Sequence, residues 1–421
     1  MKAPEKKSPD VSGYPVAGEI GLKKVFLRRE VITIYLASHL ALGCVLISII
    51  VLPLYVSHIG GSDFAAGLMG TIFTAAGVIM RLFLGPLADK KGRRFPLRLG
   101  AFVFMTAPVL IWASPNLWCM AAARVYQAIG LATYLSSASA YVTDVTPDAY
   151  RGTALGAYRM VVTFSMMIGP PVSLFIIHNL GFDAFFVFYT LIGGGAFLGA
   201  VTLPKEPAQD YGEEGEFRKI HLQEILLLFK EPKLRSSYVG ILFGSAFSGI
   251  LMTYVSIYVE RYTQIPNPAF FFTIYAGLGA LSSVAVGRLS DKFGRRVFVL
   301  PVMFAIAAGF LLLAFLPRVP WVVFILSAVL TGAGYHAGLA IFISRVVDGA
   351  DSRMKATALA FQESSIDLGI SSGIFFFGIL SGIFEFPLLF AGIGILSVLV
   401  PFFVLSMDGG KSYTSKPGDV G

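Results

Sequence analysis

The stretch "GPLADKKGRR", residues Gly85–Arg94, follows a long apolar run, and "GRLSDKFGRR", residues Gly287–Arg296, follows another. A glycine, an aspartate, a second glycine and an arginine pair recur at matching places, with an offset of 202 residues. The same offset relates Arg151 to Arg353. Self-similarity at a fixed offset indicates repeated structural units, so the next question is what each unit is built from.

The composition indicates a membrane protein. Of the 421 residues, 56% are apolar and 14% are charged, and the mean hydropathy is +0.75, whereas a soluble domain usually carries about a quarter charged residues. Runs of about 20 residues with almost no charge are long enough to cross the hydrocarbon core as helices. They lack the alternating polar positions of membrane strands. We therefore expect an all-α polytopic membrane protein. Twelve transmembrane helices are predicted, at about 31–56, 64–87, 97–114, 116–143, 152–179, 183–203, 237–260, 269–289, 297–316, 320–346, 356–381 and 385–406.

The placement of positive charge predicts the orientation. The cations cluster before span 1, between spans 2 and 3, 4 and 5, 6 and 7, 8 and 9, and 10 and 11, and in the tail, whereas the opposite loops contain only Arg261 and Arg318. Because positive residues stay on the cytoplasmic side, we expect a multi-pass protein of the cell (inner or plasma) membrane with both termini cytoplasmic. The net charge of +8 is then a topology signal, and no nucleic-acid partner is expected.

The repeat also predicts the domain organisation. We expect a cytoplasmic N-terminal segment at 1–30, a six-helix half at 31–203, a cytoplasmic linker at 204–236, a second six-helix half at 237–406 and a cytoplasmic tail at 407–421. The first thirty residues have no apolar core near Met1, so a cleaved signal peptide is not expected. Two parallel six-helix halves suit alternating access, with a substrate site between them.

Three motifs carry a resemblance to a known family. The stretch at Gly85–Arg94 resembles the loop signature between spans 2 and 3 of the major facilitator superfamily, and Gly287–Arg296 resembles its second-half counterpart. "RVYQAIG", Arg124–Gly130, is similar to the span-4 signature Arg-x-x-Gln-Gly, with two residues inserted before the last glycine. The resemblance covers essentially the whole chain and implies the fold of this family, with its twelve-span drug or sugar efflux group as the most similar branch.

The resemblance implies that the twin loop motif forms a cytoplasmic gate. Asp89 is expected to meet the N-terminus of span 11 and Asp291 that of span 5, where a helix dipole favours a carboxylate. Arg93 and Arg295 are expected to pair with acids at neighbouring helix ends, such as Asp144, Asp148, Asp348 or Asp351, and Gly85 and Gly287 to allow close helix approach. The alternative is a solvated turn that only sets topology, which would need the cations but not the repeated acid and glycines. The expected gate residues are Gly85, Asp89, Gly92, Arg93, Gly287, Asp291, Gly294, Arg295, Arg151 and Arg353.

Two carboxylates inside span 11 are the first candidates for proton coupling. Glu363 and Asp367 are four residues apart and so share one helical face, and ionisable groups in a membrane span are functional by default. Two carboxylates this close and partly desolvated do not both ionise easily, which suits a proton carrier. The alternative is that each is held by a local partner, such as a hydroxyl, and serves packing.

Arg124 in span 4 is the third candidate for proton coupling, because the signature that it matches is linked to coupling in the family. Many proton-coupled exporters of this group supply an acidic partner from span 1, but here His39 is the only ionisable residue in the middle of that span. Either His39 and Arg124 serve a different ligand, such as an anion, or the acids of span 11 take over. Gln127 lies one turn beyond Arg124 and is expected to line the same face.

Three further residues are expected to line the substrate cavity. Tyr335 and His336 lie near the middle of span 10 among glycines, where His336 would bind substrate or titrate, or alternatively pack as a hydrogen-bonded histidine. Arg159 in span 5 would reach either the cavity or the cytoplasmic rim. The same span contains Gly169–Pro170, which resembles the family's antiporter signature, with Ser165 where a glycine belongs.

The sequence favours a transporter over an enzyme. It contains no nucleotide-binding loop, no zinc-spaced Cys/His set and no nucleophile elbow, so neither a cofactor nor a metal is expected. We predict a secondary active transporter, a proton-coupled antiporter that exports small amphiphilic molecules or metabolites. Its partners would be a small-molecule substrate, protons and the lipid bilayer, and it would work as a monomer. The alternatives are a proton symporter or facilitator for uptake of a small metabolite, including an anionic one, and, more distantly, a non-transporting membrane receptor.

Overall fold

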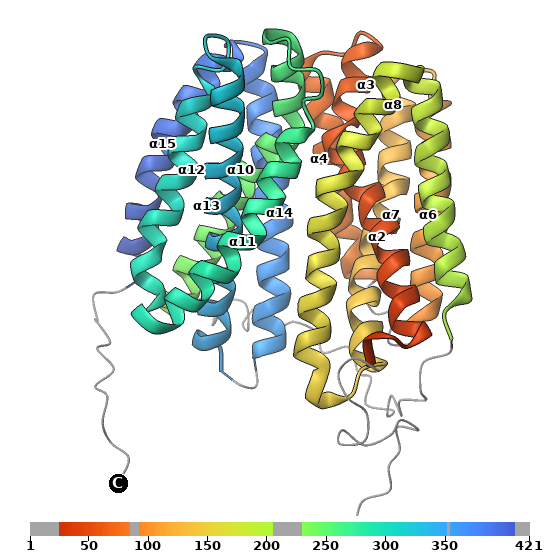
Figure 1. Ribbon diagram of the computed structural model, residues 1–421, viewed down its shortest axis with the longest axis horizontal. Helices are drawn as coiled ribbons and strands as arrows, with labels where there is room; N and C mark the ends of the chain where they lie inside the picture. Colours follow the sequence, from red (N-terminus) through yellow and green to blue (C-terminus); the bar gives the residue numbers. More distant parts are fainter. Residues whose placement is uncertain (1–24, 85–91, 205–229, 352–353, 409–421) are drawn as a thin grey trace, which may run out of the picture. The chain divides into compact units, whose positions relative to one another are not determined.

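The computed structural model describes residues 25–84, 92–204, 230–351 and 354–408, which form helices with no strand among them (Figure 1). The first half contains α2 (Arg29–Ile50), α3 (Leu52–His58), α4 (Asp63–Leu84), α6 (Arg94–Trp112), α7 (Leu117–Asp144), η1 (Asp148–Tyr150) and α8 (Arg151–Thr202). The second contains α10 (Pro232–Tyr262), α11 (Phe270–Phe293), η2 (Arg295–Phe298), α12 (Val299–Leu313), α13 (Pro320–Gly349), α14 (Lys355–Ser381) and α15 (Phe386–Ser406).

The helices of this described part account for the twelve predicted spans. Ten of them are long and apolar enough to cross a membrane. One of the ten, α8, comprises two spans, because Gly181 breaks its helical geometry with φ 82° and ψ 177°. The remaining span is α7, which is less apolar because it contains Arg124, Gln127 and many small residues. The all-helical prediction is therefore confirmed.

The chain divides into two compact units that do not follow the repeat completely. Unit 1 comprises residues 1–48 and 76–218, and unit 2 comprises residues 49–75 and 219–421. The repeat would assign residues 49–75 to the first half, yet this segment groups with the second. The predicted segments before span 1, between the halves and after span 12 lie largely outside the described residues.

Within each unit, glycines allow helices to pack with their backbones almost in contact. In unit 1, a β-carbon on Gly193 of α8 would lie 2.4 Å from the carbonyl oxygen of Phe104 on α6. In unit 2, a β-carbon on Gly373 of α14 would lie 2.1 Å from the carbonyl oxygen of Ala246 on α10. Such small-residue contacts are typical of helix pairs in membranes, where apolar side chains gain little by leaving lipid.

The segment 49–75 joins unit 2 through a row of side-chain contacts with α10 and α14. At its outer end, the Arg261 guanidinium binds both carboxylate oxygens of Asp63, at 2.8 and 2.9 Å. Deeper in the bundle, the hydroxyls of Thr74 and Ser371 lie 2.7 Å apart. This ion pair and this hydroxyl pair attach the first turns of α4 to the second half of the sequence.

Candidate functional site

A buried polar network lies in unit 1 around Arg124 of α7. Its guanidinium donates to the Ser48 hydroxyl of α2 and to the Gln127 side-chain oxygen. The Gln127 amide donates to the Tyr189 hydroxyl of α8 at 2.7 Å, which in turn donates to the carbonyl oxygen of Cys44 at 2.7 Å. Arg124 and Gln127 are both fully buried. The network ties three helices together in the interior of the unit.

The acceptors described for Arg124 are neutral dipoles. In the full sequence, the acids between positions 31 and 203 are Asp63, Asp89, Asp144, Asp148 and Asp183, all near the ends of the predicted spans. A guanidinium in a low-dielectric interior is costly unless hydrogen bonds compensate it, and the hydroxyl and amide oxygens of this network provide such compensation. In this conformation neither Arg124 nor Gln127 lines an open surface.

His39 and Arg159 lie elsewhere in unit 1. The His39 ring nitrogen Nδ1 lies 2.9 Å from the Ser165 hydroxyl of α8, and the same hydroxyl also approaches the His39 carbonyl oxygen. His39 is half-buried, whereas Arg159 is exposed on α8. The structure therefore links His39 to Ser165, the residue at a glycine position of the antiporter signature, rather than bringing it to Arg124.

In unit 2, aromatic and acidic side chains from three helices meet at Tyr335 of α13. The Tyr335 ring stacks on Tyr275 of α11, with centroids 6.2 Å apart and an interplanar angle of 24°. The Tyr275 hydroxyl lies 2.9 Å from that of Ser248 on α10. The carboxyl groups of Glu363 and Asp367 on α14 are close enough to interact electrostatically with the Tyr335 hydroxyl. The structure thus brings together three residues that the sequence predicts for coupling and substrate binding.

The two carboxylates of this cluster have different surroundings. Glu363 is exposed, although it lies well inside a spanning helix, and its carboxylate accepts a 3.2 Å hydrogen bond from the Gln362 amide. Asp367 is half-buried one turn farther along the same face. An exposed carboxylate at this depth is tolerated where it meets water rather than lipid. Such a group can exchange protons and can meet a substrate.

His336 packs between helices beside this cluster. Its ring nitrogen Nδ1 lies 3.0 Å from the Gly332 carbonyl oxygen, one turn earlier on α13. A β-carbon on Gly279 of α11 would lie 2.3 Å from the same nitrogen, so the imidazole occupies space that the glycine leaves. This placement supports the packing interpretation of His336; substrate binding by His336 stays a prediction.

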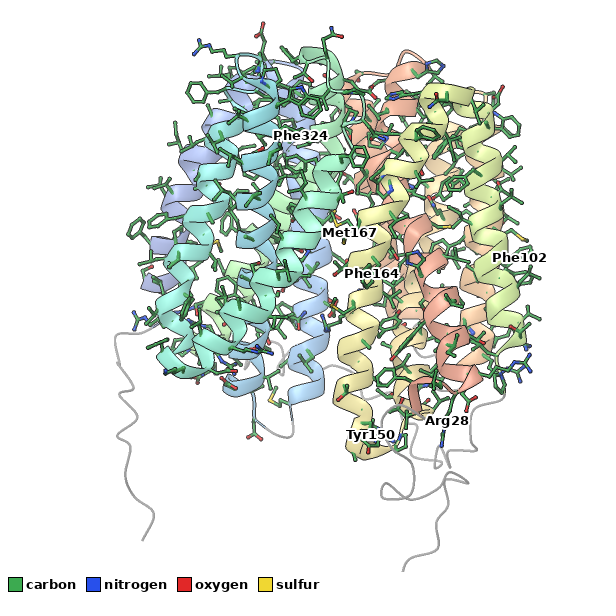
Figure 2. The ribbon with its side chains drawn as sticks, viewed as in Figure 1. Arg28, Phe102, Tyr150, Phe164, Met167 and Phe324 are labelled. Atoms are coloured by element: carbon green, nitrogen blue, oxygen red, sulfur yellow. The ribbon has the colours of Figure 1, made fainter. Side chains whose placement is uncertain are left out.

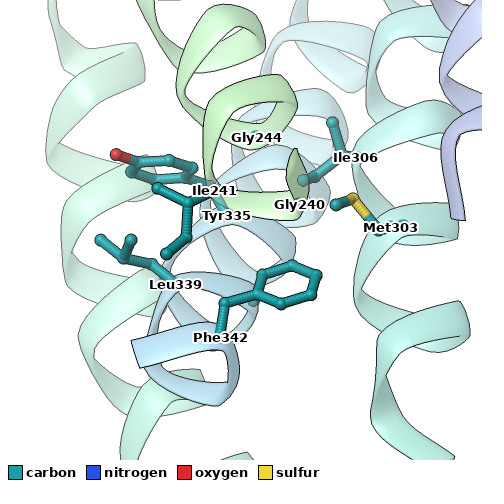
Figure 3. Close-up of a pocket in the computed structure, with 9 residues that line it drawn as sticks. Gly240, Ile241, Gly244, Met303, Ile306, Tyr335, Leu339 and Phe342 are labelled. Carbon is teal, nitrogen blue, oxygen red and sulfur yellow. The ribbon is translucent and has the colours of Figure 1, made fainter. Parts of the chain in front are cut away.

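A small hollow of about 10 Å³ adjoins Tyr335 within unit 2 (Figure 3). Its walls come from α10, α12 and α13 and are apolar apart from the tyrosine; they include Gly240, Gly244, Met303, Ile306 and Phe342. Sites for drug-sized ligands are usually about 300–1,000 Å³. This hollow is therefore too small to enclose an amphiphile of that size by itself.

The twin loop motif has matching geometry in the two units where it is described. Arg93 binds Asp144 at the end of α7 at 3.3 Å, and Arg295 binds Asp348 near the end of α13 at 2.7 Å. Gly92 and Gly294 both have a positive φ, 75° and 90°, a conformation that L-residues with side chains adopt at a cost. These positive φ values explain why each copy has a glycine directly before the arginine pair.

The remaining expected gate residues are described only in part. A β-carbon on Gly287 would meet nothing within 4 Å among the described residues, and close helix approach at Gly287 stays a prediction. Asp291 is largely exposed and pairs with Arg295 at 3.4 Å. Arg151 donates to the Thr143 carbonyl oxygen at 3.1 Å. Gly85, Asp89 and Arg353 lie outside the described residues, and the gate role of the set stays a prediction.

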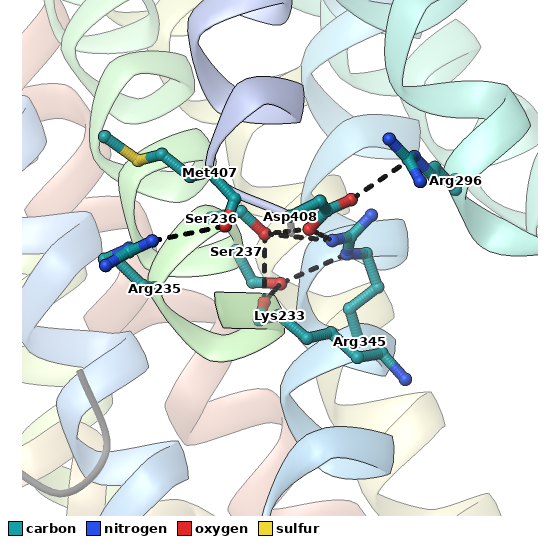
Figure 4. Close-up of polar contacts among 8 residues, drawn as sticks. All are labelled: Lys233, Arg235, Ser236, Ser237, Arg296, Arg345, Met407 and Asp408. Carbon is teal, nitrogen blue, oxygen red and sulfur yellow. Dashed lines mark hydrogen bonds and ion pairs between the residues drawn. The ribbon is translucent and has the colours of Figure 1, made fainter. Parts of the chain in front are cut away.

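A buried ionic cluster that sequence reasoning missed lies at one end of unit 2 (Figure 4). Arg345 of α13 forms an ion pair with Asp408, two residues after the end of α15, and their side chains are 3% and 6% exposed. Arg345 also donates to the Ser236 hydroxyl of α10 at 2.9 Å, and Arg296 of the loop motif lies 3.6 Å from the other Asp408 oxygen. Two features of the sequence could have indicated this cluster: an arginine in the last turn of span 10 and an acid just after span 12.

Comparison with known proteins agrees with this architecture. The family model described as Major Facilitator Superfamily matches residues 33–267 and 264–419. Among curated proteins, the chain is similar to Multidrug resistance protein MdtG of Enterobacter lignolyticus (strain SCF1), 24% identical over 76% of this chain and 78% of that protein. Among solved structures, it is similar to the nucleoside transporter NupG, with a TM-score of 0.77 and 13% identity over 91% of this chain and 100% of that one. It is also similar to the xylose transporter XylE of E. coli, with a TM-score of 0.71 and 16% identity over 91% of this chain and 97% of that one.

Proposed function

The chain belongs to the major facilitator superfamily and is a multi-pass membrane transporter, not an enzyme, and we propose that it is a proton-coupled antiporter that exports small amphiphilic molecules or metabolites. Protein halves related by an axis along the membrane normal support alternating access to a site near the bilayer midplane. The proposal specifies the coupling ion, the direction and the class of substrate, and each has its own support.

The observation that carries the proposal is the placement of Glu363 and Asp367. Both carboxylates lie on one face of a spanning helix, within electrostatic range of the Tyr335 hydroxyl, and Glu363 is exposed. A proton carrier needs a group that is reachable from water and that changes charge during the cycle. Two carboxylates one helical turn apart repel each other when both are ionised, so a change of charge at one of them would be felt by the other. Arg124, fully buried among neutral dipoles, would then modulate coupling through the packing of unit 1.

The direction of transport and the class of substrate rest on the relatives. MdtG, the similar curated protein, is a multidrug resistance protein, which favours export of amphiphilic compounds. The half-buried ring of Tyr335, which stacks on the buried Tyr275, would offer apolar contact within electrostatic range of the two carboxylates. Substrate contacts of His39, Arg159 and Gln127 in unit 1 stay predictions.

The second candidate is a proton symporter or facilitator that takes up a small metabolite, including an anionic one. The exposed cationic side chain of Arg159 and the half-buried His39 in unit 1 favour it. NupG and XylE, which share the fold, are transporters of nucleosides and of xylose. The direction of proton-driven flux separates the two candidates.

The gate and the orientation complete the proposal. We assign the twin loop motif to the cytoplasmic side, where Arg93–Asp144 and Arg295–Asp348 would hold the helix ends of each half. The three tryptophans of the chain lie at helix ends, where a membrane interface is expected. Trp112 ends α6, Trp118 begins α7 and Trp321 begins α13, all at helix ends away from the cation-rich connections and all exposed, as expected for interfacial anchors. Both termini are then cytoplasmic, the protein works as a monomer, and no nucleic acid takes part.

The test is transport by the purified protein in proteoliposomes. Vesicles that hold the protein receive a proton gradient, and labelled amphiphilic compounds, nucleosides and sugars are followed with the gradient, without it, and with an ionophore that collapses it. If the protein is an antiporter, the compound moves in the direction opposite to the flow of protons. This movement stops when the ionophore is added. Movement in the same direction as protons would establish the symporter instead, and flux that ignores the gradient would establish a facilitator.

A further inference from the structure

Two arginines lie one helical turn apart at the cation-rich end of unit 1. Arg94 and Arg98 occupy positions i and i+4 of α6 and therefore share one face. The Nε atom of each is buried and has no hydrogen-bond partner among the described residues. The Nη2 atom of Arg98 donates a 3.0 Å hydrogen bond to the Val201 carbonyl oxygen near the end of α8. Arg98 thus connects α6 with α8, and Arg94 lies one turn earlier on the same face of α6.

Nearby acids on the helices around this pair are occupied or distant. The α6 sequence contains no acid. On α7, Asp144 is bound by Arg93. On α8, Asp183 lies at the opposite end of the bundle and accepts from the Trp112 indole at 3.1 Å. Among the described residues of α6, α7 and α8, neither guanidinium group therefore forms an ion pair.

Beyond the two arginines, α6 and α8 expose apolar side chains. Phe95, Phe102 and Val109 recur every seven residues on α6 and are 42%, 42% and 44% exposed. The Phe102 ring contacts Phe197 of α8 edge-on, with centroids 5.7 Å apart, and points away from the bundle (Figure 2). Leu198 on α8 is 66% exposed. This surface is chemically suited to acyl chains.

The second half of the sequence lacks an equivalent pair. At the offset of 202, Arg94 corresponds to Arg296, which lies against Asp408, and Arg98 corresponds to Leu300. The basic pair is therefore a property of one half and not a necessary part of the repeated fold. Basic pockets between spanning helices at the cytoplasmic interface are typical binding places for anionic lipid headgroups.

We propose that Arg94 and Arg98 bind the phosphate of an anionic phospholipid whose acyl chains lie along Phe102 and Leu198. The phosphate would accept hydrogen bonds from the two guanidinium groups, and a guanidinium offers the planar geometry that a phosphate prefers. The site is occupied from the membrane, so its ligand is a lipid and not a soluble phosphate compound.

The test is lipid binding to the purified full-length protein in detergent, measured by native mass spectrometry while phosphatidylglycerol is titrated. The double variant Arg94→Gln, Arg98→Gln is expected to lower the affinity about 10- to 30-fold, because each cation near the membrane surface contributes about fivefold. Arg94→Lys with Arg98→Lys keeps the charge and should retain most of the binding. Arg288→Gln, an exposed cation on α11, is the matched control and should leave the affinity unchanged.

Phosphatidylcholine and inorganic phosphate serve as comparison ligands in the same binding experiment. Phosphatidylcholine is expected to bind the wild-type protein as weakly as it binds the double variant, and inorganic phosphate should not displace phosphatidylglycerol. Equal binding of phosphatidylglycerol by the wild type and the double variant would overturn the proposal, and so would effective competition by inorganic phosphate. If the double variant does not survive purification, each single glutamine variant supports the same test with a loss of about fivefold.

Discussion

Among the described residues, two arginines are buried, and they lie in opposite surroundings: Arg124 in unit 1 and Arg345 in unit 2. Arg124 is 0% exposed and donates to the neutral oxygens of Ser48 and Gln127. Arg345 is 3% exposed and pairs with the buried carboxylate of Asp408. One unit therefore holds its buried cation with dipoles, and the other neutralises it with a charge.

The same contrast extends to the rest of the spans. The first half has no acid in the middle of a predicted span, whereas the second has Glu363 and Asp367 on α14. A buried guanidinium in a network of dipoles is suited to a constant state of charge. Exposed and half-buried carboxylates are suited to a changing one. We therefore propose that proton exchange takes place in the second unit and that the Arg124 network acts on it only through packing.

The largest expected effect comes from breaking the buried ion pair. Arg345→Ala leaves the Asp408 carboxylate buried without its main partner, which should lower stability by about 3–5 kcal/mol. Thermal denaturation in detergent measures the loss, and Arg345→Lys is the control that keeps the charge. A melting temperature within about 2 °C of the wild type would show that Asp408 finds compensation elsewhere.

A smaller effect is expected at the twin glycines. Gly92→Ala and Gly294→Ala each place a side chain at positive φ, at a cost of about 1–2 kcal/mol. Gly287→Ala is the control, because it lies in a helix with open space around it and should be neutral or stabilising by up to about 1 kcal/mol. Similar losses at positions 92 and 294 would support equivalent loop geometry in the two copies. A loss at only one of them would contradict it.

Arg124→Met is expected to change stability less than Arg345→Ala does. Ser48 already donates to the Gln127 side-chain oxygen at 3.3 Å, and Tyr189 remains bound to Gln127, so few buried groups lose every partner. We expect a loss of about 1 kcal/mol, measured by the same denaturation experiment. A loss as large as that of Arg345→Ala would reveal a buried negative partner and remove the contrast between the units.

The smallest effect is expected at the exposed ion pair within unit 2. Asp63→Asn removes the bidentate contact with Arg261, whose side chain is 45% exposed. Exposed pairs contribute about 0.2–1 kcal/mol and are screened by salt. The difference from the wild type should therefore shrink between low and high ionic strength. A salt-independent loss of several kcal/mol would place this pair with Arg345–Asp408 rather than at the surface.

Much of the fold follows from the sequence, because hydropathy and length are local properties. The twelve spans, including the polar α7, could be read from runs of apolar residues, and the repeated glycine before each arginine pair reflects a backbone requirement. The pairing of Arg93 and Arg295 with helix-end acids was also within reach, since few acids lie near those ends.

The site was less predictable, because it depends on which helices meet. Arg345 and Asp408 are 63 residues apart, and nothing local indicates that α13 and α15 bring them together. The sequence placed Gln127 on a cavity face, but its amide joins a buried network with Tyr189, a residue without any distinguishing local pattern. The grouping of residues 49–75 with unit 2 is likewise a property of packing and not of the repeat.

The most direct test of the account compares two modes of transport in the double variant Glu363→Gln, Asp367→Asn. In proteoliposomes, we measure flux driven by a proton gradient and, separately, exchange of labelled for unlabelled substrate without a gradient. Removal of the titratable pair should abolish gradient-driven flux while exchange continues. The same substitutions of peripheral acids, Glu385→Gln and Asp183→Asn, should leave both intact. Undiminished gradient-driven flux in the Glu363, Asp367 double variant would contradict the assignment of proton coupling to the second unit.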